Sequence, residues 1–169
     1  MMNALMNENE IRVLAVRQPW ADMIIKGRKN IEVRHIPLNF KENVAIYASK
    51  YTYSGAEKEK IINYLNWLEK KNLLHYSEYL EYKNVVINGI RGAILGTVNL
   101  ESRYHNNPLY DIGVFNAYKN SHLAPDSHFK ETKTYFWHLD TPVKFETPIP
   151  YKPPKGAIVW SKTVLPEGY

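Results

Sequence analysis

Apolar residues fall in short blocks of strand length along this chain, separated by polar and turn-forming residues. Residues 12–16 form an apolar run that is typical of a strand buried on both faces. Residues 44–48 form a second such run. Residues 92–104 alternate around Gly96, a glycine that marks either a bulge or a close backbone approach. These three blocks predict three strands.

Four more segments read as strands. Residues 30–35 place Ile31 and Val33 on one face of an extended segment and polar residues on the other. The remaining strands are expected at residues 135–139, 143–145 and 157–160, with a proline-stiffened connection over residues 148–156.

Helical periodicity occurs in three places. Pro19 suits the first turn of a helix that runs to about Lys26, and Gly27 suits the left-handed residue that ends it. Residues 55–71 carry an apolar stripe at helical spacing, and residues 113–119 suit a short helix. Residues 72–88 fit either a helix or an irregular insertion.

The order of these elements predicts the fold class. Too many strands lack a following helix for a doubly wound sheet. We therefore predict an α+β fold, a small mixed β-barrel of about five to seven strands with two or three inserted helices. At 169 residues the chain has the size of one domain. We expect that domain at residues 11–162, after a flexible start at residues 1–10 and before a tail at residues 163–169.

Composition adds a hint about the partner. The chain has 13 Tyr, 4 Trp and 5 Phe, and a formal net charge of +5. Cations attract phosphates and aromatic rings stack on bases, so this balance suits RNA or a nucleotide, with DNA as an alternative. A modest excess of exposed lysines explains the same charge equally well. The oligomeric state stays open.

Other chemistries find no support in the sequence. The chain has no Cys, which excludes disulfides, thiolate catalysis and zinc sites with Cys ligands. The six His show no spacing typical of metal ligands, so we predict no metal and no cofactor. No apolar run is long enough for a signal peptide or a membrane span, so we expect a cytoplasmic protein without a membrane partner.

The candidate site lies just after the turn at Gly27. Lys29, Glu32 and Arg34 follow at fixed offsets, and we expect Arg17 and Lys50 to join them at the mouth of one cleft. Cations around one carboxylate would bind an anionic ligand, because Arg grips phosphate or carboxylate with two bonds and Lys adds a point charge. The alternative is an exposed salt bridge between Glu32 and Lys29 or Arg34, worth about 0–1 kcal/mol.

A catalytic version of the site is also open. Glu32 could serve as a general base while Lys29, with its pKa lowered by neighbouring cations, stabilises an oxyanion. Hydrolysis of an amide or of a phosphodiester would fit these two residues.

Other residues complete the predicted ligand-binding set. Tyr47, Tyr51, Tyr53 and Trp137 flank the expected cleft and could stack on bases, or belong to the core. Ligand-binding roles are also predicted for the polar residues Gln18, Ser49 and Thr97, the last two of which could equally be ordinary strand residues.

Five segments together resemble one known family. Residues 27–34, Gly-Arg-Lys-Asn-Ile-Glu-Val-Arg, match the signature G-x-K-x-x-E-x-R of the ASCH domain family, a branch of the PUA-like superfamily. The other segments that resemble the family are residues 14–21, 46–50, 92–100 and 148–160. Residues 51–91 and 105–131 have no clear counterpart and are expected to be insertions.

The resemblance implies a PUA-like twisted barrel with a cleft and an association with RNA. Some similar proteins are amidohydrolases that deacylate modified cytidine with a Lys and a Thr of this octet, and others are ribonucleases. The Lys corresponds to Lys29, but the Thr position holds Glu32, which is not a hydroxyl nucleophile. Our first hypothesis is therefore an RNA-binding or modified-nucleotide-binding domain. A hydrolase that uses the same cleft and a protein-interaction domain are the two alternatives.

Overall fold

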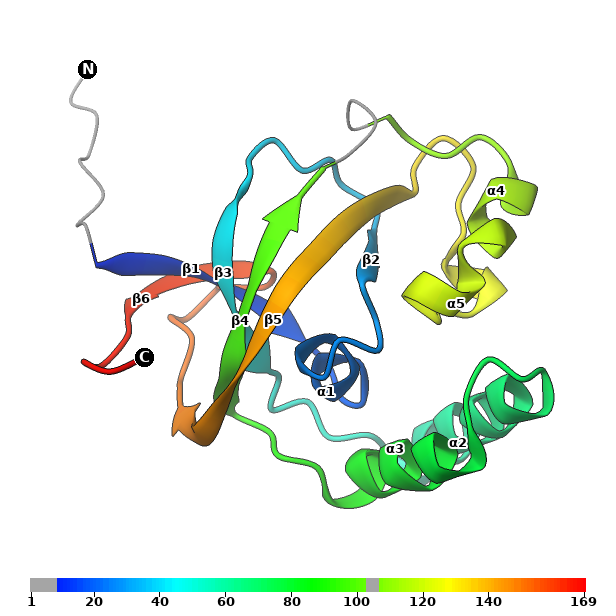
Figure 1. The fold of residues 1–169 in the computed structure, drawn as a ribbon, viewed down its shortest axis with the longest axis horizontal. Coiled ribbons are helices and arrows are strands. Elements are labelled where there is room, and N and C mark those ends of the chain that lie inside the picture. Colours follow the sequence, from blue (N-terminus) through cyan, green and yellow to red (C-terminus); the bar gives the residue numbers. More distant parts are fainter. Residues whose placement is uncertain (1–8, 103–106) are drawn as a thin grey trace.

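The computed structural model describes residues 9–102 and 107–169, so most of the predicted flexible start, residues 1–8, lies outside it. Six strands of the described residues form one mixed sheet in the order β2-β5-β4-β3-β1-β6 (Figure 1). β1 pairs with β3 in parallel, and every other pair is antiparallel. The strands are β1 Glu10–Val16, β2 Ile31–Arg34, β3 Glu42–Ala48, β4 Ala93–Glu101, β5 Tyr135–Pro150 and β6 Trp160–Val164. The predicted α+β class and strand number are confirmed.

Two predicted boundaries near the C-terminus are wrong. The strands expected at residues 135–139 and 143–145 are one strand, β5, which continues through Pro150. The last strand begins at Trp160 rather than ending there, and it pairs with β1 from Leu14 to Glu10. The position of β6 is set by its pairing with β1. The local sequence does not encode this long-range pairing.

The sheet curls strongly but its backbone ladder does not close into a barrel. β2 and β6 are its two edges. Trp137 on β5 nevertheless stacks on Trp160 on β6, with ring centroids 5.8 Å apart and an angle of 15° between the planes. Three strands lie between β5 and β6 in the sheet. Side chains inside the curl therefore connect strands that the hydrogen-bonded ladder keeps apart.

Gly96 occupies a point of close backbone approach, as predicted. A Cβ atom at this position would lie 2.0 Å from the carbonyl oxygen of Val143 on β5. The register between β4 and β5 shifts on either side of the same region. Only glycine fits this contact, and bulges of this kind bend a sheet.

Several helices lie between the strands of the described residues. They are α1 Trp20–Ile25, α2 Gly55–Lys70, α3 Tyr76–Asn88, α4 Ile112–Ala117 and α5 Lys119–His122, with a short 3₁₀ turn, η2, at Asp126–His128. Gly27 ends the first helical segment at φ +75°, as predicted. The described residues thus hold more helices than the two or three expected, because residues 76–88 form α3 and the short helix predicted at residues 113–119 is divided into α4 and α5.

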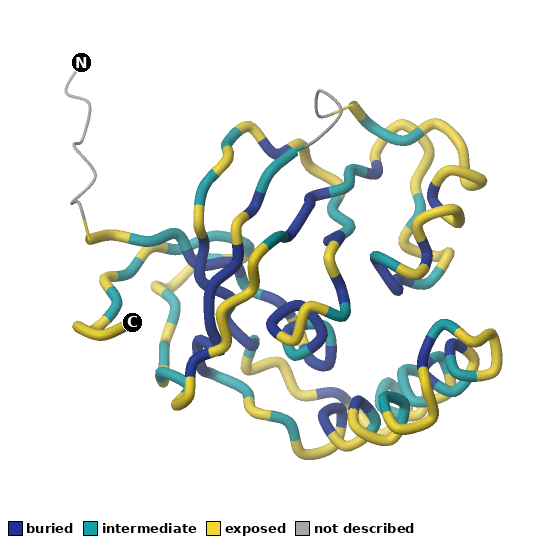
Figure 2. The backbone as a smooth tube through the Cα atoms, in the orientation of Figure 1, coloured by how far each residue is buried: buried dark blue, intermediate teal, exposed yellow. Residues whose placement is uncertain are grey.

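Packing explains why the ambiguous segment becomes a helix. α3 lies beside α2, and Tyr82 and Val86 of α3 share a buried cluster with Leu65 and Leu68 of α2 (Figure 1). A separate cluster inside the sheet includes Leu14, and Figure 2 shows buried residues concentrated where β3 and β4 pass beside α1.

Among the described residues, no helix combines the length and the apolar character that crossing a membrane requires.

Candidate ligand-binding cavity

A cavity of about 720 Å³ lies between the sheet and the helices. Its volume falls in the range of pockets that hold small molecules, about 300–1,000 Å³. Six segments contribute to its walls, within residues 15–20, 29–35, 49–53, 60–64, 124–128 and 158–159. The lining carries four Lys or Arg side chains and one carboxylate, which leaves a formal charge of +3 with neutral histidines.

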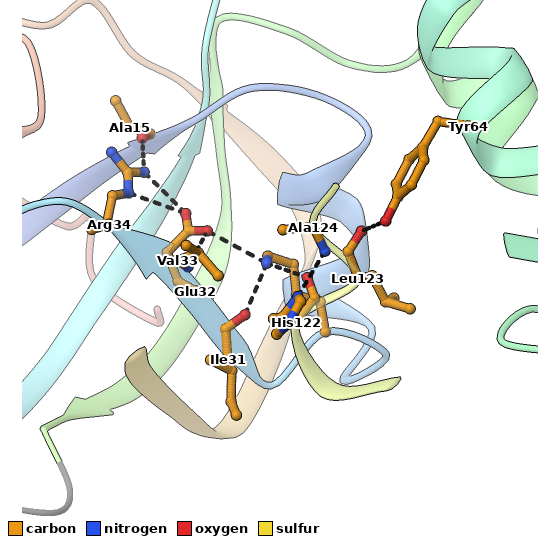
Figure 3. A network of polar contacts seen from close by, with 10 residues as sticks. Ala15, Ile31, Glu32, Val33, Arg34, Tyr64, His122, Leu123 and Ala124 are labelled. Atoms are coloured by element: carbon orange, nitrogen blue, oxygen red, sulfur yellow. Dashed lines mark hydrogen bonds and ion pairs between the residues drawn. The ribbon is translucent and has the colours of Figure 1, made fainter. Parts of the chain in front are cut away.

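Lys29 reaches this wall because the chain after α1 is held tightly. The N–H groups of Arg28 and Lys29 both donate to the carbonyl of Met23, 2.9 and 3.0 Å away. The Lys29 side chain is 2% exposed. Its ammonium donates to the carbonyls of Ile31 (2.8 Å) and His122 (2.6 Å) and lies 3.5 Å from Glu32 Oε1 (Figure 3). Three acceptors match its three N–H bonds.

Glu32 is held from both sides. Its Oε2 accepts from Arg34 Nη2 (3.0 Å) and Nε (3.3 Å), and its Oε1 accepts from the N–H of Val33 (3.1 Å) and faces Lys29. The four interactions occupy the lone-pair positions of a carboxylate. Arg34 uses Nη2 a second time, for the carbonyl of Ala15, and its Nη1 has no hydrogen bond to the described residues (Figure 3).

Burial and pairing set the charge states in this network. Burial lowers the pKa of Lys29, and the nearby Glu32 carboxylate opposes that shift. Burial alone would raise the pKa of Glu32, but Arg34 and Lys29 outweigh it and hold that pKa below its usual value. Glu32 is thus an ionised, fully engaged carboxylate, which makes it a weak general base.

His122 on α5 supports the same network as a neutral ring. Its Nδ1 accepts from the N–H of Ala124 (2.9 Å), and its Nε2 lies 2.8 Å from the carbonyl of Phe115, so the proton belongs on Nε2. Burial lowers the pKa of His122 to about 4. The backbone carbonyl of His122 accepts a hydrogen bond from the Lys29 ammonium. In this way α5 helps to hold the Lys29 side chain in place.

Arg17 presents a different kind of cation. It is exposed, lines the cavity, and makes no ion pair or hydrogen bond through its side chain with any described residue. Its guanidinium carbon lies 3.7 Å from the ring centroid of Tyr51. The Tyr51 hydroxyl donates to Glu57 (2.8 Å), and its ring meets Tyr53 edge-on at 5.4 Å. Arg17 therefore rests on an anchored aromatic platform.

Another part of the cavity wall comes from α1 and α2. Trp20 and Tyr64 lie 6.2 Å apart between ring centroids and, with Ile61, line the cavity with apolar surface. The Tyr64 hydroxyl donates to the carbonyl of Leu123 (2.9 Å; Figure 3). Lys60, one helical turn before Tyr64, is exposed and also lines the cavity.

Seven of the twelve predicted site residues meet at this cavity. Those that line it are Arg17, Lys29, Glu32, Arg34 and Ser49, together with Tyr51 and Tyr53. Ser49 is placed by its N–H, which donates to the carbonyl of Val16 (2.9 Å). The exposed salt bridge considered for Glu32 is wrong, because Glu32 is 7% exposed.

The structure does not bring the other five to the cavity. Gln18 is buried, and its amide donates to Asp22 (2.8 Å) and to the carbonyl of Ile90 (2.9 Å). The Lys50 side chain lies against Gly92, where a Cβ atom would meet its Cε at 2.9 Å. The remaining three are placed in the sheet, Tyr47, Thr97 and Trp137.

Burial explains the placement of those sheet residues. Tyr47 belongs to a cluster with Val13 and Phe145 and meets Tyr151 edge-on at 5.4 Å. Thr97 pairs with Ala45 in the ladder between β3 and β4. Trp137 is fully buried, and its indole N–H donates to the carbonyl of Ile36 (3.2 Å). A ring in this environment has no face to offer a base.

Several cavity residues were not predicted from the sequence. Lys60 and Tyr64 have the i, i+4 spacing that puts both on one face of α2, but this spacing alone does not indicate that the face lines a cavity. Pro125, Ser127 and His128 come from the insertion at residues 105–131, and nothing in their local sequence indicates a site.

Comparisons with known proteins give a likeness of fold. No protein-family model matches the chain. No curated protein matches it either. Among solved structures, it is similar to the ASCH protein of Zymomonas mobilis, with a TM-score of 0.49 and 16% identity over 92% of this chain and 87% of that one. A serine-to-alanine variant of that protein also has a TM-score of 0.49, with 14% identity over 95% of this chain and 91% of that one. Both of these solved structures are described as ASCH proteins.

Proposed function

We propose that this protein binds a nucleotide, free or at the end of a single-stranded RNA, in the 720 Å³ cavity. One observation carries the proposal: exposed cations and an aromatic wall line the same cavity. Arg17 and Lys60 supply charge for a phosphate, and Trp20 and Tyr64 supply apolar surface for a base. Phosphate contacts give affinity, and stacking on aromatic rings adds about 1–3 kcal/mol per base.

The contacts of Lys29 and Glu32 support binding over hydrolysis by these two residues. All three N–H bonds of the Lys29 ammonium point to protein acceptors. Glu32 has a lowered pKa and accepts from Arg34 and Val33. A base that activates water needs an available lone pair and a pKa near the working pH. The pair is better suited to shaping the cavity than to proton transfer.

Binding of labelled single-stranded RNA and of mononucleotides, measured by anisotropy and calorimetry, tests the proposal. We expect affinity to fall as salt rises, since each phosphate contact releases counterions. Lys60→Gln should weaken binding several-fold, because Lys60 lines the cavity. Lys70→Gln makes the same change of charge at the end of the same helix, outside the cavity, and should leave binding unchanged.

Two outcomes would refute the proposal. The first is the absence of binding to RNA and to every mononucleotide at low salt. The second is equal weakening by Lys60→Gln and Lys70→Gln, which would indicate a diffuse charge effect rather than a site. Release of product from RNA or from an acylated nucleoside, abolished by Lys29→Met in a folded protein, would favour the hydrolase instead.

A further inference from the structure

The cations around the cavity divide into two groups by their contacts. Lys29 is saturated, and Arg34 is bound to Glu32 and Ala15. Arg17 has no hydrogen bond or ion pair through its side chain among the described residues, although it lines the same cavity. A guanidinium offers five N–H donors in a fixed plane, so all of the Arg17 donors are available to a ligand.

Contacts within the protein position the guanidinium plane of Arg17 before a ligand binds. Tyr51 lies under Arg17 at 3.7 Å and is anchored by Glu57 through its hydroxyl. Glu57 is anchored in turn, because it also accepts from the backbone N–H of Ser54 (2.7 Å) at the start of α2. The stack holds one face of the guanidinium against the ring and leaves its edge open. A planar fork presented edge-on suits two oxygens of one phosphate.

Charge balance favours a phosphate with two ionised oxygens. The cavity lining has a formal charge of +3. A phosphate monoester carries about −1.5 to −2 at pH 7, whereas a diester linkage inside a strand carries about −1. A monoester therefore balances more of the cavity charge. Its place at the end of a nucleotide also agrees with a cavity of small-molecule size.

We infer that Arg17, held on Tyr51, binds a terminal phosphate, so that the cavity selects a phosphorylated nucleotide over the corresponding nucleoside. The base would then lie toward Trp20 and Tyr64, the apolar wall. This inference rests on the proposed function and assigns its specificity to one side chain. Two sources share the chemistry, a free mononucleotide and the phosphorylated end of an RNA strand.

Paired ligands that differ only in the phosphate test the inference. Calorimetry compares uridine with UMP, adenosine with AMP, and a short RNA with a 5′-phosphate or a 5′-hydroxyl. We expect each phosphorylated member to bind the wild type at least about tenfold more tightly, as charge-assisted hydrogen bonds should provide. Tight binding of UMP or AMP would indicate a free nucleotide as the source. Tight binding of the phosphorylated RNA alone would indicate a strand end, and both results support the inference.

Variants of Arg17 test whether this side chain causes the preference for phosphorylated ligands. Arg17→Gln should reduce the preference for phosphate to within about twofold, and Arg17→Lys should keep part of it, since Lys retains the charge without the fork. Arg12→Gln removes an arginine from the same part of the chain outside the cavity, where Arg12 pairs with Glu42, and should leave the preference intact. Among the described residues Arg17 makes no hydrogen bond through its side chain, so Arg17→Gln should lose only the contact with Tyr51 and melt close to the wild-type temperature.

Two results would overturn the inference while sparing the proposed function. One is equal affinity of the wild type for nucleosides and nucleotides, and the other is an unchanged preference in folded Arg17→Gln. Failure of all nucleosides, nucleotides and RNAs to bind would refute the proposed function itself. The two failures are therefore distinguishable in one set of titrations.

Discussion

Arg34 on β2 donates from Nη2 to the backbone carbonyl of Ala15 on β1, 3.0 Å away. Three strands lie between β2 and β1 in the order of the sheet, so this contact spans the open side of the curl (Figure 3). The same nitrogen holds Glu32, also at 3.0 Å. One side chain thus joins two strands, β2 and β1, that are not paired with each other in the sheet.

Replacing Arg34 should loosen that connection. We expect Arg34→Met to lower the free energy of unfolding by about 2–3 kcal/mol, because it removes hydrogen bonds to a buried carboxylate. Urea denaturation measures the change. Lys41→Met breaks an ion pair with Glu101 at the surface and should cost at most about 1 kcal/mol. Equal losses in the two variants would contradict a special role for Arg34.

Lys29 should be more important for stability than for chemistry. Lys29→Met removes the partner of buried Glu32 and the donor to two carbonyls, so we expect a loss of about 3–5 kcal/mol. Lys26→Met, which breaks an exposed pair with Glu81, serves as the control and should cost about 1 kcal/mol or less. A Lys29→Met protein as stable as the wild type would show that the network contributes little.

Stability should depend on pH through His122. Its folded pKa is about 4, against 6.5 for the ordinary group. Between these values the unfolded chain binds more protons than the folded one, so the free energy of unfolding falls as the pH is lowered. We expect this residue to account for a loss of about 2 kcal/mol between pH 7 and pH 5.

Unfolding curves at pH 7 and pH 5 measure the contribution of His122. In His122→Asn the loss should shrink by that amount, because Asn does not titrate. His75→Asn replaces an exposed histidine before α3 and should behave as the wild type. A His122→Asn protein with the wild-type pH dependence would contradict the assignment.

Trp137 should act in the core rather than on a ligand. Trp137→Phe removes the hydrogen bond to Ile36 and part of the stack on Trp160, so we expect a loss of about 1–3 kcal/mol. Affinity for RNA and nucleotides should stay within about twofold of the wild type, because Trp137 is fully buried. Weaker binding at unchanged stability would place Trp137 at the ligand after all.

Local sequence predicted the turns and close contacts of this fold well. Gly27 adopts a positive φ, and Gly96 lies against Val143, as their neighbours indicated. Such features depend on a few adjacent residues or on the lack of a Cβ atom. The triplet Lys29, Glu32 and Arg34 was also found from its spacing after a turn.

The state of that triplet could not be predicted in the same way. Whether Lys29 is available depends on the carbonyl of His122, 93 positions further along the chain. Whether Trp137 can stack on a base depends on Trp160, which belongs to a strand at the other edge of the sheet. Spacing indicates which residues lie near one another locally, whereas burial and saturation of donors arise from contacts between distant segments.

Because the sheet is curled but not closed, the cavity lies where two strands that are not paired with each other come together. Ala15 on β1 and Arg34 on β2, which the curl brings together, both line the cavity. A bound molecule that contacts both strands would oppose their separation, and its binding free energy would add to the stability of the folded state. Amide hydrogens of β2 should then exchange with solvent more slowly when the cavity is occupied. Hydrogen exchange and melting temperature therefore report occupancy of this cavity for any compound, including one that undergoes no reaction.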